Sequence, residues 1–108
     1  MNISLPEPIA AYFAADKVGG EAVALCFTND AVVKDEGHAY TGLASIRQWK
    51  ATASAKYQYT SEPFHSEMID GTTIVSCHVT GSFPGSPVDL RYFFRLDRGK
   101  VASLEILV

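Results

Sequence analysis

Hydrophobic positions near the start of the chain recur at helical spacing. Ile9, Tyr12 and Phe13 fall at i, i+3 and i+4, which places them on one face of a helix. Gly19-Gly20 is typical of a helix end. The pattern therefore predicts a first helix up to this point and a second one over about residues 21–27.

A short hairpin and a third helix are predicted next. Residues 31–35 read as a short strand, Glu36-Gly37 as a turn, and residues 38–40 as a second short strand. Apolar residues then return at helical spacing from Leu43 to Lys56, which predicts the third helix.

The second half of the chain has the alternating pattern of strands. Residues 88–96 alternate most clearly, with apolar side chains from Val88 to Leu96 on one face and a mixed set on the other. Asp70-Gly71 is a strong hairpin signal, and Pro63 requires a bulge or an edge position. The predicted strands are 57–69, 72–83, 88–96 and 101–108.

This order of elements predicts a single α+β domain over residues 1–108. Consecutive strands joined by tight turns form an antiparallel sheet, and the three helices of the N-terminal half must cover one of its faces. A sheet of such long strands twists and curls. We therefore expect a cone-shaped curved antiparallel sheet whose mouth can admit a small apolar molecule.

Composition and charge narrow the range of partners. The net charge is −3, and the nine Lys and Arg residues are scattered rather than clustered. We therefore expect neither a nucleic acid nor a membrane as partner. No targeting segment is evident, so we expect a cytoplasmic protein. No cofactor or metal motif is present, and we expect no cofactor and no metal.

The cysteines and two of the histidines have structural interpretations. Cys26 and Cys77 sit in apolar surroundings, which favours buried small side chains over a disulfide or a catalytic thiol. The spacing of His65 and His78 is not that of a metal site, and a surface or interface position is the better interpretation of both. Phe93 shares the mixed face of its strand, and an exposed aromatic there suggests a homodimer through the outer face of the sheet.

Several motifs follow one another in a defined order. They are Tyr12-Phe13, then Phe27-x-x-Asp30-Ala31-Val32-Val33-x-Asp35, then Tyr40-x-Gly42-x-x-x-Ile46-x-x-Trp49, and late in the chain Phe94-x-Leu96-Asp97-x-Gly99-Lys100-Val101-x-x-Leu104. Their order and spacing resemble the nuclear transport factor 2-like superfamily, closest to its SnoaL-like polyketide cyclases and ketosteroid isomerases. The resemblance implies a cone-shaped α+β fold that is often dimeric through the outer sheet face, and it implies no single activity.

The resemblance suggests two catalytic residues. Asp35 lies where the isomerases place a carboxylate base, although it can also be a strand-end residue that accepts hydrogen bonds from the turn. Tyr12 lies where the isomerases carry a tyrosine that donates a hydrogen bond to the developing oxyanion. Its alternative interpretation is a buried helical aromatic.

The resemblance weakens at two further positions. Tyr92 stands where the isomerases add a protonated aspartate; a tyrosine there can donate one hydrogen bond but fills space that a steroid ring needs. Lys50 stands where they carry a bracing tyrosine. A smaller carbonyl compound is therefore a better substrate candidate than a steroid. His38 lies near Asp35 and is either a helper in acid-base chemistry or a surface turn residue.

We therefore expect a cofactor-independent isomerase, cyclase or lyase that acts on a small apolar carbonyl compound. A binding protein without chemistry, or a dimeric interaction module whose cone is filled by aromatic side chains, are the alternatives. The catalytic set would be Asp35, Tyr12, Tyr92 and His38. The expected pocket wall is Phe27, Val33, Trp49, Cys77, Val79, Phe94 and Leu104.

Overall fold

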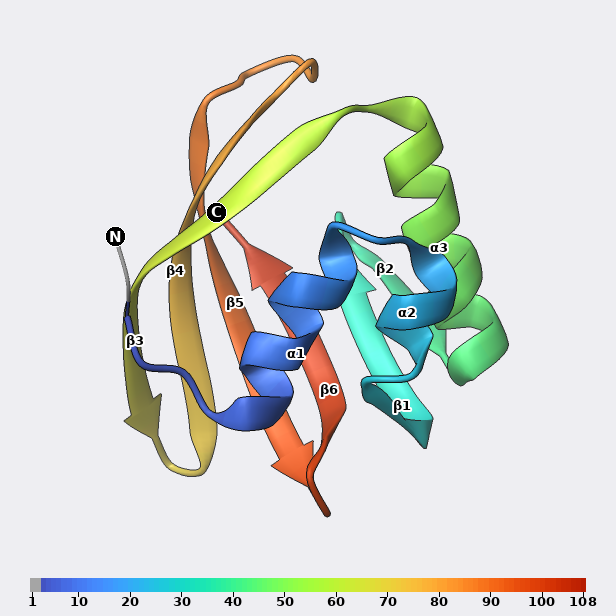
Figure 1. Cartoon of the computed structure of the whole chain (residues 1–108), viewed down its shortest axis with the longest axis vertical. Coiled ribbons are helices and arrows are strands. Elements are labelled where there is room, and N and C mark those ends of the chain that lie inside the picture. Colours follow the sequence, from blue (N-terminus) through green and yellow to red (C-terminus); the bar gives the residue numbers. More distant parts are fainter. Residues whose placement is uncertain (1–2) are drawn as a thin grey trace.

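The computed structural model describes residues 3–108, and Met1 and Asn2 lie outside the described residues. This part of the chain forms three helices and six strands (Figure 1). The predicted α+β class is confirmed. In chain order the elements are α1 (Glu7–Asp16), α2 (Gly20–Ala24), β1 (Phe27–Asp35), β2 (His38–Thr41), α3 (Leu43–Lys56), β3 (Tyr59–Ile69), β4 (Thr72–Gly81), β5 (Val88–Asp97) and β6 (Lys100–Leu107).

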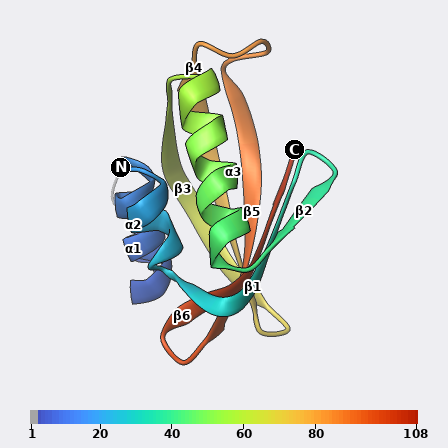
Figure 2. The same ribbon diagram turned by 90° about the vertical axis from the view of Figure 1, so that its right-hand side faces the viewer.

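The strands form one curved sheet in the order β2-β1-β6-β5-β4-β3. The strands from β3 to β6 form the expected antiparallel meander, and β1 pairs antiparallel with β2. The sheet is mixed rather than wholly antiparallel, because β6 returns beside β1 and pairs with it in parallel. The helices gather on one side of this curved sheet, where α3 packs against α2 and over β1 and β2 (Figure 2).

Tight turns fix the register of the hairpins. Glu36-Gly37, Asp70-Gly71 and Arg98-Gly99 all have positive φ angles, as the two central residues of a type I′ hairpin turn require. The first of these turns ends β1 directly after Asp35 and so fixes the place of that carboxylate. The bulge predicted at Pro63 is also confirmed, since the register of the edge strand β3 shifts between Pro63 and His65.

The second helix is shorter than the sequence pattern predicted. It ends at Ala24, and Phe27, which we had expected on the helix, is the first residue of β1. Phe27 pairs with Val101 of β6, and the Val101 amide donates a 2.8 Å hydrogen bond to the Cys26 carbonyl oxygen. Pairing with a strand from the far end of the chain therefore overrides the local helical pattern.

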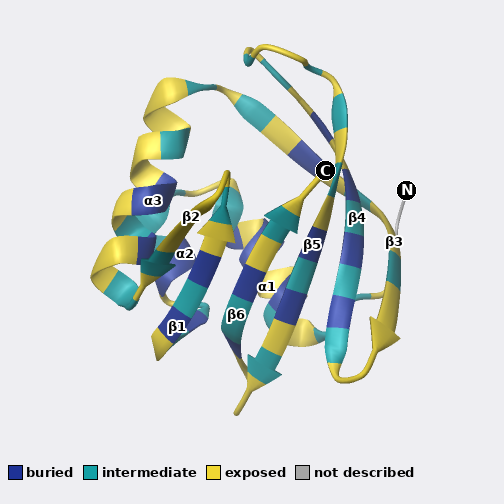
Figure 3. Cartoon of the chain, turned by 180° about the vertical axis from the view of Figure 1, so that it is seen from behind, coloured by how far each residue is buried: buried dark blue, intermediate teal, exposed yellow. Residues whose placement is uncertain are grey.

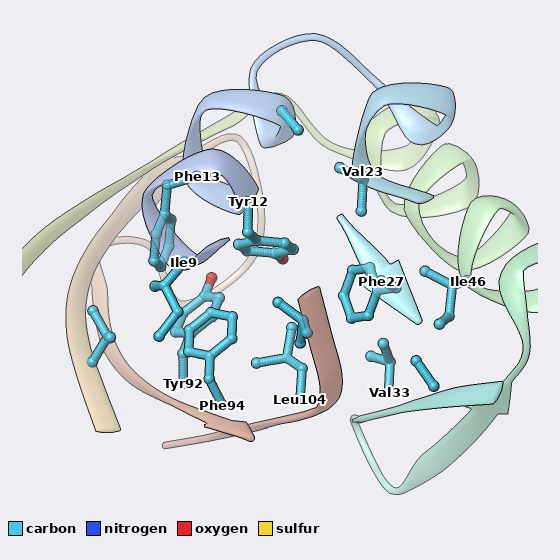
Figure 4. Packing of buried hydrophobic residues seen from close by; sticks show 14 of the residues in the cluster. Ile9, Tyr12, Phe13, Val23, Phe27, Val33, Ile46, Tyr92, Phe94 and Leu104 are labelled. Atoms are coloured by element: carbon cyan, nitrogen blue, oxygen red, sulfur yellow. The ribbon is translucent and has the colours of Figure 1, made fainter. Parts of the chain in front are cut away.

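The hydrophobic core lies between the helices and the concave face of the sheet. Alternate residues of β4 and β5 are buried, as their period of two predicted, and the other residues face outward (Figure 3). Tyr12 from α1 contacts the rings of Phe27, Tyr92 and Phe94 edge-on or tilted, with centroids 5.4–6.4 Å apart (Figure 4). This aromatic cluster closes one end of the cone.

Exposed polar side chains lie on the outer face of the sheet at strands β4 and β5. His78 of β4 and Asp89 of β5 form an exposed pair with Nδ1 and Oδ1 2.7 Å apart, which confirms the surface position of His78. His65 is exposed as well. Phe93, on the same face, is half-buried beneath the Arg91 guanidinium rather than fully exposed. Among residues 3–108, no helix is long and apolar enough to cross a membrane.

Candidate functional site

A cavity of about 630 Å³ lies between the concave face of the sheet, α1 and α3. Its wall is mainly apolar, with a few polar groups from Asp35, Glu36 and the tyrosines. Such a space holds a small, largely apolar molecule, and the polar groups on the wall can orient it. The lining residues are Tyr12, Asp35, Glu36, Gly37, Trp49, Ala53, Tyr57, Tyr59, Val79, Phe83, Pro84, Gly85, Val88, Leu90, Tyr92, Ile106, Leu107 and Val108.

Asp35 is half-buried on the cavity wall and is held by a tryptophan. The Trp49 indole Nε1 donates a 3.1 Å hydrogen bond to Asp35 Oδ2. Burial raises the pKa of the Asp35 carboxyl, and the charge of Glu36 raises it further. The hydrogen bond from Trp49 and the charge of Lys50 lower this pKa, but the net shift is upward. Asp35 is thus a carboxylate whose proton affinity is raised by its surroundings, as a general base requires.

Tyr12 reaches the same cavity from α1. Only 2% of the residue is exposed, and its hydroxyl makes no hydrogen bond to any of residues 3–108. Burial raises the pKa of this phenol well above its usual value, and the nearby Tyr92, Asp16 and Asp35 add to the effect. The hydroxyl is therefore a neutral donor at physiological pH. Asp35 and Tyr12 line one cavity, and the charge of Asp35 contributes to the raised pKa of Tyr12.

Tyr92 also lines the cavity, but its hydroxyl has a protein partner. The Tyr92 and Ser61 hydroxyl oxygens are 3.3 Å apart and share a hydrogen bond in a buried setting. Burial raises the pKa of Tyr92 despite this hydrogen bond, so the phenol is neutral. The Tyr92 hydroxyl can accept this hydrogen bond from Ser61 and donate its own proton to a ligand, or it can donate to Ser61.

His38 does not line the main cavity. It pairs with Asp35 across the two strands, is exposed, and lines a smaller hollow of about 290 Å³ that shares Asp35 and Glu36 with the cavity. No hydrogen bond joins His38 to any other described side chain. The structure therefore brings Asp35, Tyr12 and Tyr92 together and leaves His38 outside this group.

The expected pocket wall is divided between cavity and core. Trp49 and Val79 line the cavity. The other five expected residues are buried in the closed end of the cone, where helix side chains cover the sheet, and do not line the cavity: Phe27, Val33, Cys77, Phe94 and Leu104. Period-two alternation identifies the inward face of a strand but does not show where along the strand the helices stop covering it.

Cys77 is fully buried in the core, where burial raises the pKa of its thiol to about 12. A thiol in this state is a poor nucleophile, in agreement with the interpretation of a small buried side chain. Both cysteines are free. Within residues 3–108, no three His, Cys, Asp or Glu side chains converge as a metal site would require.

A second polar cluster, which sequence reasoning missed, lies beside the cavity. The Lys50 ammonium forms an ion pair with the Asp16 carboxylate and a hydrogen bond with the Tyr59 hydroxyl. The Tyr59 hydroxyl also donates to Asp16 Oδ1 at 3.4 Å. Tyr59 lines the cavity, whereas Lys50 is only 1% exposed. A lysine on the helix face that also carries Ile46 and Trp49 was the available signal for a buried charge.

Comparison with solved structures agrees with the fold and the motifs. A putative polyketide cyclase from Sinorhizobium meliloti has a TM-score of 0.90 and 39% identity, with 94% of each chain covered. A hypothetical protein from Catenulispora acidiphila with a ketosteroid isomerase-like fold, solved with trimethylamine, has a TM-score of 0.85 and 19% identity, covering 97% of this chain and 87% of that one.

A third similar structure is a putative polyketide cyclase from Xanthomonas campestris. It has a TM-score of 0.77 and 15% identity, covering 92% of this chain and 85% of that one. No family model matches the chain, and no curated protein matches it. At 39% identity over nearly the whole length, the Sinorhizobium protein is a relative and more than a shared fold. The chain belongs to the SnoaL-like, nuclear transport factor 2-like superfamily, as a relative of the putative polyketide cyclase from Sinorhizobium meliloti.

Proposed function

We propose that this protein is a cofactor-independent isomerase, cyclase or lyase acting on a small apolar carbonyl compound, with Asp35 as base and Tyr12 as oxyanion donor. One observation carries the proposal: the Asp35 carboxylate and the unpaired Tyr12 hydroxyl open on the same apolar cavity. The similarity to a putative polyketide cyclase from Sinorhizobium meliloti supports this class of chemistry.

The proposed step begins with removal of a proton from the carbon next to the carbonyl group. Asp35 takes the proton, and the electrons of the C–H bond move toward the carbonyl oxygen to form an enolate. Tyr12 donates a hydrogen bond to that oxygen as its negative charge develops. Return of the proton to another carbon gives isomerisation, and attack of the enolate carbon on a second carbonyl gives ring closure.

The cavity wall supports a small substrate. Tyr92 and Trp49 reduce the space beside Asp35, and their rings offer flat apolar surfaces. A compound of one or two rings with one carbonyl group fits this description better than a steroid does. Tyr92 would give a second donor to the oxyanion when its hydroxyl accepts, rather than donates, the hydrogen bond with Ser61.

Hydrogen-deuterium exchange next to a carbonyl group tests the proposal. The protein is mixed with 2-tetralone, an apolar two-ring ketone, in D2O, and loss of the proton signal is followed by NMR. Asp35→Asn should slow the catalysed exchange by about 10²–10⁴-fold, the usual contribution of a general base. Tyr12→Phe should slow it by roughly 10²-fold or more, as for loss of an oxyanion donor.

Two variants serve as matched controls. Asp30→Asn removes an exposed carboxylate from the same strand, and Tyr40→Phe removes a hydroxyl from a tyrosine that does not line the cavity. Both should exchange at the wild-type rate. Equal rates in wild type and Asp35→Asn, across a panel of small ketones, would contradict the proposed base.

The alternatives predict different results. A binding protein without chemistry would bind the ketone, detected by quenching of its single tryptophan, Trp49, without speeding exchange. The cavity of about 630 Å³ argues against a cone filled by its own aromatics. The homodimer through the outer sheet face stays a prediction, which sedimentation of Phe93→Arg against wild type tests. The cytoplasmic location, and the absence of nucleic-acid and membrane partners, also stay predictions.

A further inference from the structure

Lys50 is the one charged residue that is buried among residues 3–108. It lies on α3, and its ammonium group contacts two elements far away in sequence. Asp16, the last residue of α1, is its ion-pair partner, and Tyr59, the first residue of β3, shares its other hydrogen bond. The ammonium also lies 4.5 Å from the centroid of the Tyr59 ring. Lys50 therefore joins α1, α3 and β3 at one point beside the cavity.

Asp16 and Lys50 each lie close to a residue of the proposed site. Asp16 follows Tyr12 by four residues, so the two side chains project from the same face of α1. Lys50 follows Trp49, whose indole holds the Asp35 carboxylate. The Lys50 ammonium lies 6.0 Å from the centroid of the Trp49 ring. The ion pair thus ties the helix that carries Tyr12 to the helix that holds Asp35.

We propose that Lys50 is a positioning residue of the reaction: its ammonium group, fixed by Asp16 and Tyr59 behind the cavity wall, joins the helix that carries Tyr12 to the helix that holds Asp35 and places a positive charge behind both residues. This inference rests on the proposed role of Asp35. It adds a residue that does not line the cavity and does not touch the substrate.

The electrostatic surroundings of Asp35 support this role. Burial and the charge of Glu36 raise the pKa of Asp35, and Lys50 is the one cation that lowers it. The other titratable groups around Asp35 are Tyr12 and Tyr92, whose phenols are neutral, and Lys34, His38 and Glu105, which line the smaller hollow with it. Without Lys50, the hydrogen bonds from Trp49 and from the Glu36 backbone would still favour the ionised form, but no buried positive charge would oppose the effects of burial and Glu36.

The surroundings of Tyr12 give the second argument. The charge of Asp16 raises the pKa of Tyr12, and the same charge would oppose an enolate oxygen bound to the Tyr12 hydroxyl. Pairing with Lys50 offsets this charge at short range. A buried ion pair is weak evidence for stability, since apolar residues often replace one without loss. An electrostatic role in the site would explain why a charged residue, and not an apolar one, is buried at position 50.

The test is a carboxyl NMR titration of Asp35 in four variants, with Asp35→Asn used to assign the signal. Lys50→Met should raise the pKa of Asp35 relative to wild type. Asp16→Asn should lower it, because the positive charge of Lys50 then acts without its counter-ion. The double variant Asp16→Asn/Lys50→Met should fall between the two single variants. Lys56→Met, an exposed lysine on the same helix, should leave the value unchanged.

Shifts of opposite sign in the two single variants distinguish this role from a structural one, since loosening of the fold would move both in the same direction. The inference is overturned if Lys50→Met leaves the pKa of Asp35 at the wild-type value, or if both variants shift it alike. Should Lys50→Met fail to fold, Asp16→Asn and the double variant still show the sign of the shift in the pKa of Asp35. The titration needs no substrate, so the pKa shifts can be observed even if the protein catalyses no exchange. Conversely, exchange can be catalysed even if the pKa shifts are absent.

Discussion

Two carboxylates lie beside the cavity in opposite settings. Asp35 accepts a hydrogen bond from the Trp49 indole and another from the Glu36 backbone, and it faces the cavity. Asp16 is paired with Lys50, accepts a further hydrogen bond from Tyr59, and does not line the cavity. The first has the raised proton affinity of a base, and the second is neutralised by its partner.

The difference shows how one small domain separates a reactive carboxylate from a structural one. The number and charge of the partners that each carboxylate has therefore decide which of the two remains available to a substrate.

The largest loss of stability is expected when the positive charge of Lys50 is removed from beside Asp16. Lys50→Met leaves the Asp16 carboxylate, whose side chain is only 9% exposed, without a counter-charge, and we expect the free energy of unfolding to fall by about 3–5 kcal/mol. Asp16→Asn/Lys50→Met removes both charges and should be markedly more stable than the single variant. Urea denaturation measures both. The contrast between the carboxylates would break if the single variant were as stable as the double variant.

Removing the hydrogen bond from Trp49 to Asp35 should destabilise the protein less than removing Lys50 does. Trp49→Phe removes the 3.1 Å hydrogen bond, and we expect the free energy of unfolding to fall by roughly 1–3 kcal/mol. The hydrogen bond stabilises the ionised form, so the pKa of Asp35 should rise as well. Carboxyl NMR measures the shift, and Tyr40→Phe, whose ring lies 6.2 Å from that of Trp49, is the control. An unchanged or lowered pKa would show that Trp49 does not hold the charged form.

The raised pKa of Asp35 should make stability depend on pH. The folded protein holds this proton more tightly than the unfolded chain, so the stabilisation is present at low pH and is lost as the pH rises through the folded pKa. Asp35→Asn has no such loss. The difference in melting temperature, Asp35→Asn minus wild type, should therefore be more positive at pH 7 than at pH 4. We expect this change to be smaller than the effect of Trp49→Phe. Asp30→Asn should show no such trend, and a difference that becomes more negative as the pH rises would contradict the direction of the pKa shift.

The smallest effect is expected on the outer face of the sheet. Asp89 forms an exposed pair with His78, and solvent screens such pairs. Asp89→Asn should change the free energy of unfolding by no more than about 0.5–1 kcal/mol, with less change still in high salt. Denaturation at low and high salt measures this. A larger loss would mean that this carboxylate also has a buried partner, such as a second copy of the chain.

Part of the site followed from the sequence. The end of β1 at Asp35 was predictable, because Glu36-Gly37 is a turn whose second residue accepts a positive φ. The place of Tyr12 on the inner face of α1 followed from helical spacing and from the resemblance to the isomerases. The third helix was predicted from Leu43 to Lys56, as observed.

Other parts depended on contacts between distant segments. The Asp16–Lys50–Tyr59 cluster joins residues that are 34 and 43 positions apart along the chain from Asp16, and no local pattern links them. The hydrogen bond from Trp49 to Asp35 is of the same kind. The start of β1 at Phe27 was set by pairing with Val101 in a strand that forms from the end of the chain.

The order of elements and the inward faces of the strands were predictable from the sequence, because they follow from local periodicity and turn chemistry. The two candidate catalytic residues followed from spacing shared with a known superfamily. The tertiary structure was needed to show that β6 pairs with β1 in parallel, where the cavity ends and the core begins, and which carboxylate faces the cavity. Those outcomes depend on how far the helices cover the curved sheet and on which side chains meet there, and neither is encoded in any short stretch of the chain.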